Sequence, residues 1–493
     1  MSDETILLGY TDNNGKVAPV SLNLKRANRH GLIAGATGTG KTVTLQALAE
    51  SFSQQGVPVF LADVKGDVSG ISQAGKSHPK VNERLQALGL PIDQWCGCPT
   101  IFWDMYGKQG HPVRATISDM GPLLLARLMG LNETQEGVLN IAFALADDKG
   151  LLLLDLKDLR AMLKHVSENA AELRDMYGNV SSSSVGAIQR RLLMLERSGA
   201  KKFFGEPMLD LEDLMQVDAS GAGYVNVLVA NKLVQEPAVY STLLLWLMSE
   251  LFENLPEIGD PDKPRLVVFF DEAHLMFKDT PKALVDKIEQ VVRLIRSKGV
   301  GIYFITQSPG DIPDSVLAQL ANRVQHALRA FTPKEQKVIK AAADTFRSDG
   351  SFSVLEAISQ MGIGEALIST LQANGAPSAV KRTMVKPPVS RIGPAKKAEH
   401  NAVIEESPYA GKYEETIDRE SAFELLSKRA AKAAEEATEV KPTKKRVNAA
   451  PKPRGRQRQG IGETFIKSMV RSLGSKAGRA LVRGIMGSLF KGR

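Results

Sequence analysis

One eight-residue stretch has the residue types and spacing of a phosphate-binding loop. It matches the pattern G-x-x-x-x-G-K-[ST], and its residues are Gly35, Ala36, Thr37, Gly38, Thr39, Gly40, Lys41 and Thr42. In such a loop, backbone N–H groups surround a phosphate, the lysine reaches the β- and γ-phosphates, and the hydroxyl binds Mg²⁺. The sequence therefore predicts that these residues hold ATP or GTP, with Lys41 also stabilising the reacting phosphates and Thr42 at the metal.

An acidic pair supplies the expected second half of a nucleotide site. Asp271 and Glu272 follow the apolar run 265–270, as in a Walker B strand. We expect Asp271 to hold Mg²⁺ and Glu272 to polarise the attacking water as a general base. The second carboxylate favours a hydrolytic ATPase over a kinase or GTPase. The letters DEAH also spell the motif of one helicase group, but no Ser-Ala-Thr motif follows.

Three further residues are candidates for contacts with the γ-phosphate. Gln307 follows the apolar run 301–306, where it would bind the γ-phosphate or the water, unless it only faces solvent. ATP hydrolysis of this kind commonly needs a cation at the transition state, often from a neighbouring subunit. Arg296 is our candidate for that role in trans and Arg329 for a contact in cis. For each arginine the alternative is a solvated or salt-bridged side chain.

The elements that would position these residues alternate between short apolar runs and helical stretches. A strand at 31–34 precedes the loop and a helix at 43–49 follows it. Further strands are predicted at 57–63, 100–104, 224–229, 265–270, 301–306, 324–329 and 365–369, and we expect 365–369 to be the last strand of the globular part. Strands separated by helices indicate an α/β fold with a mainly parallel sheet and helices on both faces.

The composition changes along the chain and suggests five regions. They are the first part of the ATPase core (1–119), a helical insertion (120–220), the second part of the core (221–390), a charged helical linker (391–440) and a basic tail (441–493). The net charge of +8 is concentrated in that tail. Residues 441–493 contain fifteen Lys or Arg and one acidic residue, or +14, so the rest of the chain carries −6.

The chain shows neither a secretory signal nor an apolar run long enough to span a membrane, so we expect a cytoplasmic protein. Cys96 and Cys98 are best explained as two free thiols. The basic tail also allows a location at the nucleoid or at a membrane surface. Residues 441–459 suit nucleic acid, which would place the protein at the nucleoid. Residues 461–490 form a basic amphipathic pattern that suits a membrane surface, a partner protein or phosphate groups. The alternative is a helix that packs against the chain itself or pairs in an oligomer.

Several segments together resemble the bacterial HerA-like ATPases, over about residues 20–390. They are GATGTGKT, VFLADVKGD, LVVFFDEAHLMF, IRSKGVGIYFITQSPGDIP and NRVQHALRAFTPKE. The resemblance implies a RecA-like P-loop core of the HerA/FtsK superfamily with ATP and Mg²⁺ as cofactors. It also implies a homo-oligomer, as a hexameric ring, that moves double-stranded DNA.

One departure from the family limits what can be carried over. Archaeal HerA helicases have an N-terminal β-barrel, whereas about thirty residues precede the loop here. We therefore do not expect the partner-docking roles of that barrel in this chain. Two other functions stay open: a secretion- or conjugation-type motor acting on protein or at the membrane, and a scaffold gated by ATP.

Overall fold

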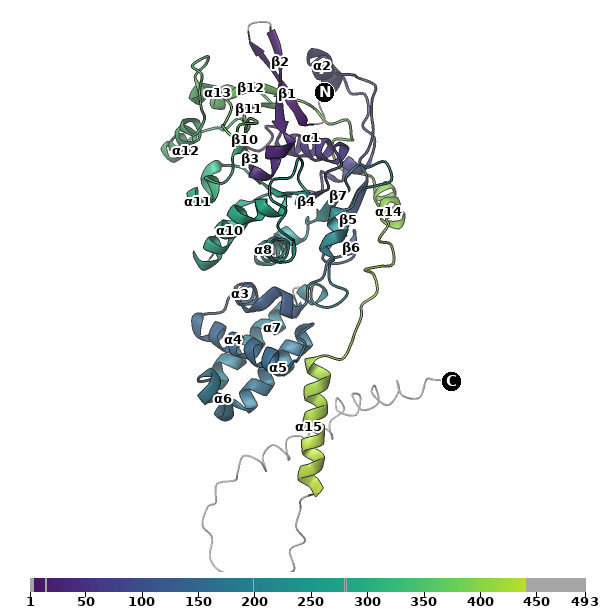
Figure 1. Cartoon of the computed structure of the whole chain (residues 1–493), viewed down its shortest axis with the longest axis vertical. Coiled ribbons are helices and arrows are strands. Elements are labelled where there is room, and N and C mark those ends of the chain that lie inside the picture. The colour runs from purple at the N-terminus through teal and green to yellow at the C-terminus, as the bar shows by residue number, and fades with distance from the viewer. Residues whose placement is uncertain (1–3, 14–15, 198, 279, 281, 440–493) are drawn as a thin grey trace, which may run out of the picture. The chain divides into compact units, whose positions relative to one another are not determined.

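The computed structural model describes residues 4–13, 16–197, 199–278, 280 and 282–439 (Figure 1). Residues 1–432 form one compact unit and residues 433–493 a second. The predicted basic linker 441–459 and the predicted helix 461–490 lie outside the described residues. No helix among the described residues is long and apolar enough to cross a membrane.

The described strands form one twelve-stranded sheet, with the order β2-β1-β12-β11-β10-β3-β9-β8-β4-β7-β5-β6. Their bounds are β1 Thr5–Asn13, β2 Lys16–Asn23, β3 Gly31–Ala34, β4 Val59–Asp63, β5 Thr100–Asp104, β6 His111–Pro112, β7 Val225–Val229, β8 Leu266–Phe270, β9 Val300–Thr306, β10 Asn322–Gln325, β11 Glu365–Ser369 and β12 Lys381–Val385. Strands β10 through β6 in this order pair in parallel, and the pairs from β2 to β10 are antiparallel. The predicted α/β fold with a mainly parallel sheet is confirmed.

Two apolar cores cover the two faces of the parallel strands. In β3, Ile33 packs in one core with Phe52 of helix α1 (Lys41–Gln54). Leu32 belongs to the other core, which also holds Trp246 of helix α8 (Pro237–Asn254). Strands buried on both faces read as continuous apolar runs, which is why the sequence pattern located them. Because the strands are parallel, their carboxyl ends meet at one edge, where ligands commonly bind.

The antiparallel end of the sheet differs from the sequence-based expectation. The segment 365–369 is not the last strand, because β12 follows it and pairs with both β11 and β1. The strand predicted at 324–329 is shorter and shifted, and it ends as β10 at Gln325. Beyond Gln325 the chain turns toward the phosphate loop, with the Ala36 N–H donating to the Ala327 carbonyl at 2.9 Å.

The helices occupy the connections between strands and the C-terminal part of the chain. Their bounds are α1 Lys41–Gln54, α2 Pro79–Ala87, α3 Ile117–Met129, α4 Glu133–Asp148, α5 Leu156–Glu168, α6 Ala170–Tyr177, α7 Ser182–Arg197, α8 Pro237–Asn254, α9 His274–Phe277, α10 Lys282–Leu294, α11 Asp314–Leu317, α12 Pro333–Asp344, α13 Val354–Gln360, α14 Lys397–Glu405 and α15 Ala422–Glu439. Helices α3–α7 follow β6 and gather into one group, with α3 packed on α8 (Figure 1). The five proposed region boundaries remain predictions.

Candidate nucleotide site

The phosphate loop connects β3 directly to α1 and has a shape that only glycine allows at one position. Gly40 has a left-handed φ of 112°, and a Cβ there would lie 3.2 Å from the Gly364 nitrogen. The Gly364 N–H donates to the Thr39 carbonyl at 2.9 Å, so a residue just before β11 stabilises the phosphate loop by a hydrogen bond. The Thr39 hydroxyl donates to the Ala36 carbonyl at 2.7 Å and closes the loop on itself.

Lys41 is folded back onto this loop. Its Nζ donates to the carbonyl oxygens of Gly35 at 2.6 Å and Ala36 at 3.0 Å, and the residue is 8% exposed. Burial lowers the pKa of Lys41, and the nearby Lys65 ammonium lowers it further, while Glu272 and Asp271 oppose both effects. A buried cation held only by carbonyl oxygens is suited to bind phosphate oxygens.

The acidic pair lies one strand away from the loop strand. Strand β9 separates β3 from β8, so the residues after Thr306 lie between the loop and Asp271. Burial raises the pKa of the Asp271 carboxyl to about 7, with the Glu272 carboxylate as the second cause. Asp271 Oδ1 accepts the Glu272 N–H at 2.9 Å, and its backbone carbonyl accepts the Tyr240 hydroxyl at 2.8 Å.

Glu272 is held in an unusual backbone conformation with its carboxylate among polar groups. Its φ is 49°, a left-handed value that is rare for a residue with a side chain. Gln307 Nε2 donates to Glu272 Oε2 at 3.3 Å, and His274 Nδ1 lies 3.3 Å from the same oxygen. Lys65 Nζ lies 3.5 Å from Oε1. The structure thus brings Glu272 and Gln307 together, as a general base and a sensor would require.

Lys65 is a site residue that sequence reasoning missed. It lies in the turn after β4, and the Asp63 carboxylate shapes this turn by accepting the N–H groups of Gly66, Asp67 and Val68 at 2.7–3.1 Å. Burial raises the pKa of Asp63 to about 6. The segment VFLADVKGD contains this turn, but only the pairing of β4 with β8 shows that it lies next to Glu272.

We predict that Lys65→Ala lowers kcat for ATP hydrolysis by about 10- to 100-fold, since a displaced Glu272 would no longer be aligned with the attacking water. KM for ATP should change much less, and Lys65→Arg should restore most of the rate because it keeps the cation. Steady-state phosphate release measures both parameters. Lys76→Ala, at an exposed lysine in a nearby loop, is the control. A wild-type kcat in Lys65→Ala would show that Glu272 needs no help from this lysine.

His326 is a second residue without a predicted role that contacts the loop region. It is fully buried, with Nδ1 at 2.9 Å from the Glu365 carbonyl and Nε2 at 2.9 Å from the Thr44 hydroxyl. Burial lowers its pKa to about 4, so the ring is neutral at physiological pH. A neutral ring donates from Nδ1 and accepts at Nε2. His326 therefore ties α1 and β11 to the loop, and a Cβ on Gly35 would lie 2.5 Å from its Cβ.

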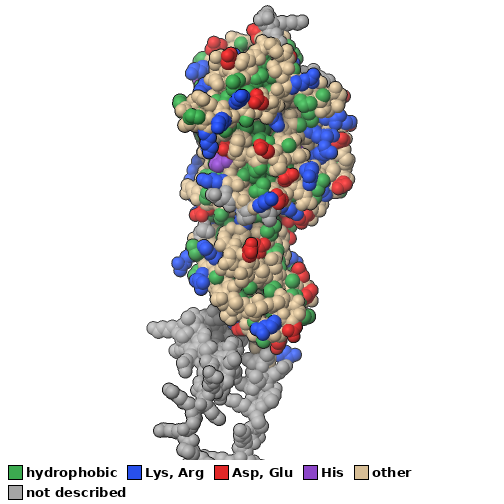
Figure 2. Space-filling model, turned by 90° about the vertical axis from the view of Figure 1, so that its left-hand side faces the viewer, with side chains coloured by type: hydrophobic (Ala, Val, Ile, Leu, Met, Phe, Trp, Pro, Cys, Tyr) green, Lys and Arg blue, Asp and Glu red, His purple; other side chains and the backbone are tan. Residues whose placement is uncertain are grey.

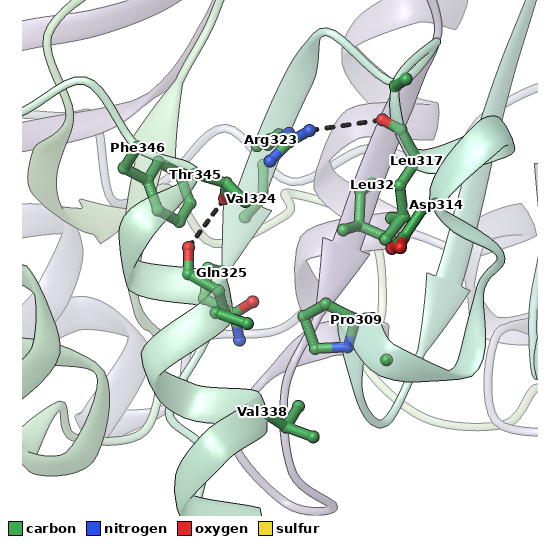
Figure 3. Close-up of a pocket in the computed structure, with 14 residues that line it drawn as sticks. Leu32, Pro309, Asp314, Leu317, Arg323, Val324, Gln325, Val338, Thr345 and Phe346 are labelled. Carbon is green, nitrogen blue, oxygen red and sulfur yellow. Dashed lines mark hydrogen bonds between the residues drawn. The ribbon is translucent and has the colours of Figure 1, made fainter.

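Within a single chain, the arginine side chains considered for the transition state do not contact the phosphate loop. Arg329 is exposed and donates from Nη1 to the Ser359 carbonyl and from Nη2 to the Met361 carbonyl at 3.3 Å. Arg323, which lies within β10, donates to the Leu317 carbonyl at 3.3 Å beside a cavity of about 300 Å³ (Figure 3). Arg296 is exposed, and within the described residues it has no carboxylate partner.

On the side of the molecule that carries α10–α12, the charges do not identify one arginine or lysine as the residue that acts in trans. Figure 2 looks onto that side and shows Lys and Arg side chains intermixed with Asp and Glu. Exposure of Arg296 leaves its guanidinium accessible to a neighbouring subunit, as a residue acting in trans must be. The roles of Arg296 and Arg329 remain predictions.

The residues present fit a magnesium ion held mainly by nucleotide phosphates. Mg²⁺ usually takes one or two protein oxygens together with phosphate oxygens and waters. Thr42 at the start of α1 and Asp271 at the end of β8 are the oxygen donors proposed for it. In the described part of the chain, no three His, Cys, Asp or Glu residues group as ligands. Burial and the neighbouring Glu272 carboxylate both raise the pKa of Asp271, and a divalent cation would stabilise the charged form of this carboxyl.

Comparison with known proteins places these features in a family. A family model described as "Helicase HerA-like C-terminal" matches residues 10–493. The "DNA double-strand break repair helicase HerA" of Sulfurisphaera tokodaii is 24% identical over 386 residues, which cover 74% of this chain and 67% of that protein. The protein of the same name from Saccharolobus solfataricus is 20% identical over 362 residues, covering 72% of this chain and 64% of that protein. The chain thus spans about two thirds of the length of these relatives.

A solved structure shares the fold. The "Plasmid coupling protein TrwB in complex with the non-hydrolysable GTP analogue GDPNP" superimposes with a TM-score of 0.50 at 13% identity. The match covers 77% of this chain and 90% of that chain. At this identity the likeness concerns the fold alone.

Proposed function

This chain belongs to the HerA-like helicase C-terminal family of P-loop ATPases, and from that premise we propose that it is a Mg²⁺-dependent ATPase that moves double-stranded DNA as an oligomeric ring. The observation that carries the hydrolytic part is the grouping around Glu272. A carboxylate with low exposure, next to Gln307 and Lys65 and one strand away from the phosphate loop, is what a general base needs.

In the proposed mechanism, the loop and Lys41 hold the β- and γ-phosphates of ATP. Lys41 would exchange the carbonyls of Gly35 and Ala36 for phosphate oxygens. Glu272 accepts the proton of the attacking water, while Gln307 orients that water or the γ-phosphate. Mg²⁺, held by Thr42 and Asp271, would neutralise charge on the phosphate oxygens.

The oligomeric part of the proposal rests on the arginines and on the family. Within one chain, Arg329 and Arg323 are engaged with backbone carbonyls, and Arg296 is exposed at the surface. A cation for the transition state would then come from Arg296 of an adjacent copy. Double-stranded DNA and a hexamer are proposed from the family and from relatives named as DNA repair helicases.

The test combines an ATPase assay with a mass measurement on the full chain. We expect double-stranded DNA to raise the rate of phosphate release at least about fivefold, the lower end of typical coupling between two sites. Native mass measurement with ATP and Mg²⁺ should reveal a hexamer. An ATPase that DNA does not stimulate, but that binds anionic vesicles through residues 441–493, would favour the membrane or secretion motor. Absence of any turnover would favour the ATP-gated scaffold.

A further inference from the structure

A second cavity opens at the same edge of the sheet, beyond the turn that carries Lys65. Its volume is about 440 Å³, and it lies at the carboxyl ends of β4 and β7. Asp63 and Gly66 of the turn line it from one side, while α14 contributes residues from the other. The turn 63–68 therefore separates this cavity from Glu272, which Lys65 approaches from the opposite side.

Three lysines from separate parts of the chain line this cavity, which we call the lysine cavity. Lys108 follows β5, Lys232 follows β7, and Lys397 begins α14. All three are exposed, and among the described residues none lies within 4.0 Å of a carboxylate. Like charges brought together around a hollow repel each other, and a bound anion would relieve that repulsion.

The carboxylates that end β4 and β5 accept hydrogen bonds from the backbone. The Asp63 carboxylate accepts three N–H groups of its own turn. The Asp104 carboxylate accepts the N–H groups of Tyr106, Lys108 and Gln109 at 2.8–2.9 Å. Among the described residues, neither carboxylate forms an ion pair with the three lysines. Three lysines and one carboxylate, that of Asp63, line the cavity, so the lining carries a net positive charge.

The lining suits a phosphate group better than a nucleobase. Val229, Pro394 and Ala395 are its apolar members and offer no flat ring for a base to stack on. His400 also borders the cavity, but its ring stacks on Phe102 with centroids 3.9 Å apart and its Nε2 lies 2.8 Å from the Gln109 carbonyl. Ammonium groups bind phosphate oxygens as point charges without demanding a fixed planar geometry.

We infer that the lysine cavity binds phosphate oxyanions at a site distinct from the phosphate loop. The phosphates come either from the backbone of DNA or from a free polyphosphate compound. The inference does not depend on DNA translocation, since a free polyphosphate would satisfy the same lysines. Because the turn 63–68 borders both sites, an anion in the cavity contacts the segment that carries Lys65.

The test compares two variants with the same change in charge. The cavity variant combines Lys108→Gln, Lys232→Gln and Lys397→Gln. The control variant combines Lys334→Gln, Lys337→Gln and Lys340→Gln, three exposed lysines of α12. One arm measures binding of a mixed-sequence DNA duplex over a range of salt concentrations. The other arm measures binding of tripolyphosphate, with Lys41→Ala in every protein so that the phosphate loop does not contribute.

We expect the cavity variant to bind at least one probe about tenfold more weakly than the control variant does. If DNA supplies the phosphates, the slope of log affinity against log salt should become shallower by about 0.9 for each lysine that contacts a phosphate. In the wild-type chain, the same probe should protect Lys108, Lys232 and Lys397 from acylation, read by peptide mass spectrometry. This protection is measured without any substitution, so it does not depend on how the variants fold.

The possible outcomes separate the two sources and the two proposals. An effect confined to DNA identifies the nucleic-acid backbone, and an effect confined to tripolyphosphate identifies a free compound. Equal binding by both variants, with no protection of the three lysines, overturns the inference. Failure of the wild-type chain to bind DNA at all counts against the proposed DNA motor. The tripolyphosphate measurement would then still show whether the lysine cavity binds phosphate.

Discussion

Glu272→Gln is expected to bind ATP with nearly wild-type affinity and to hydrolyse it about 10²- to 10⁴-fold more slowly, the range for loss of a general base. Glutamine has the size of glutamate and can still bond to Gln307 and lie near Lys65, but it cannot accept the proton of the attacking water. Binding and chemistry should therefore separate in this variant. A fluorescent ATP analogue measures the first and single-turnover phosphate release the second.

The control for this experiment is Glu257→Gln, the same change at an exposed glutamate. It should leave both affinity and rate unchanged. A wild-type rate of hydrolysis in Glu272→Gln would mean that another group activates the water. A loss of ATP affinity as large as the loss of rate would instead assign Glu272 to binding.

Lys41→Ala is expected to lose nucleotide binding, the step that precedes the hydrolysis lost in Glu272→Gln. Lys41 is 8% exposed, and its ammonium bonds to two carbonyl oxygens of the loop. Residues 35–42 contain no other cationic side chain that could take its place. Loss of charge-assisted bonds to the β- and γ-phosphates should weaken ATP binding by about 10²-fold or more, at 1.5–3 kcal/mol for each bond to a charged group. Hydrolysis should then be undetectable at ATP concentrations that saturate the wild-type chain.

Lys337→Ala, at an exposed lysine of α12, is the matched control and should behave as the wild type. Thermal unfolding of Lys41→Ala should be measured with and without ATP. In the wild type, ATP should raise the unfolding temperature because it binds only the folded state. Equal stabilisation of Lys41→Ala by ATP would contradict the assignment of residues 35–42 as the phosphate site.

The local parts of the candidate site were predictable from the sequence because each depends on a short stretch of chain. Residues 35–42 follow a buried strand and begin a helix, and the acidic pair follows another buried strand, as the pattern requires. Apolar runs mark the strands of a sheet buried on both faces. The strand predicted at 324–329 was shifted because the chain leaves the sheet at Gln325 to contact the loop, a tertiary effect.

The sequence by itself determined the chemistry: a phosphate loop, two consecutive carboxylates and a mainly parallel sheet to present them. Only the tertiary structure decided which other residues join them. The order of strands in the sheet depends on how helices pack on its two faces. The pattern of apolar residues therefore could not predict that β9 lies between β3 and β8. The same packing sets β4 beside β8, which brings Lys65 to Glu272 and leaves the lysine cavity on the other side of one turn.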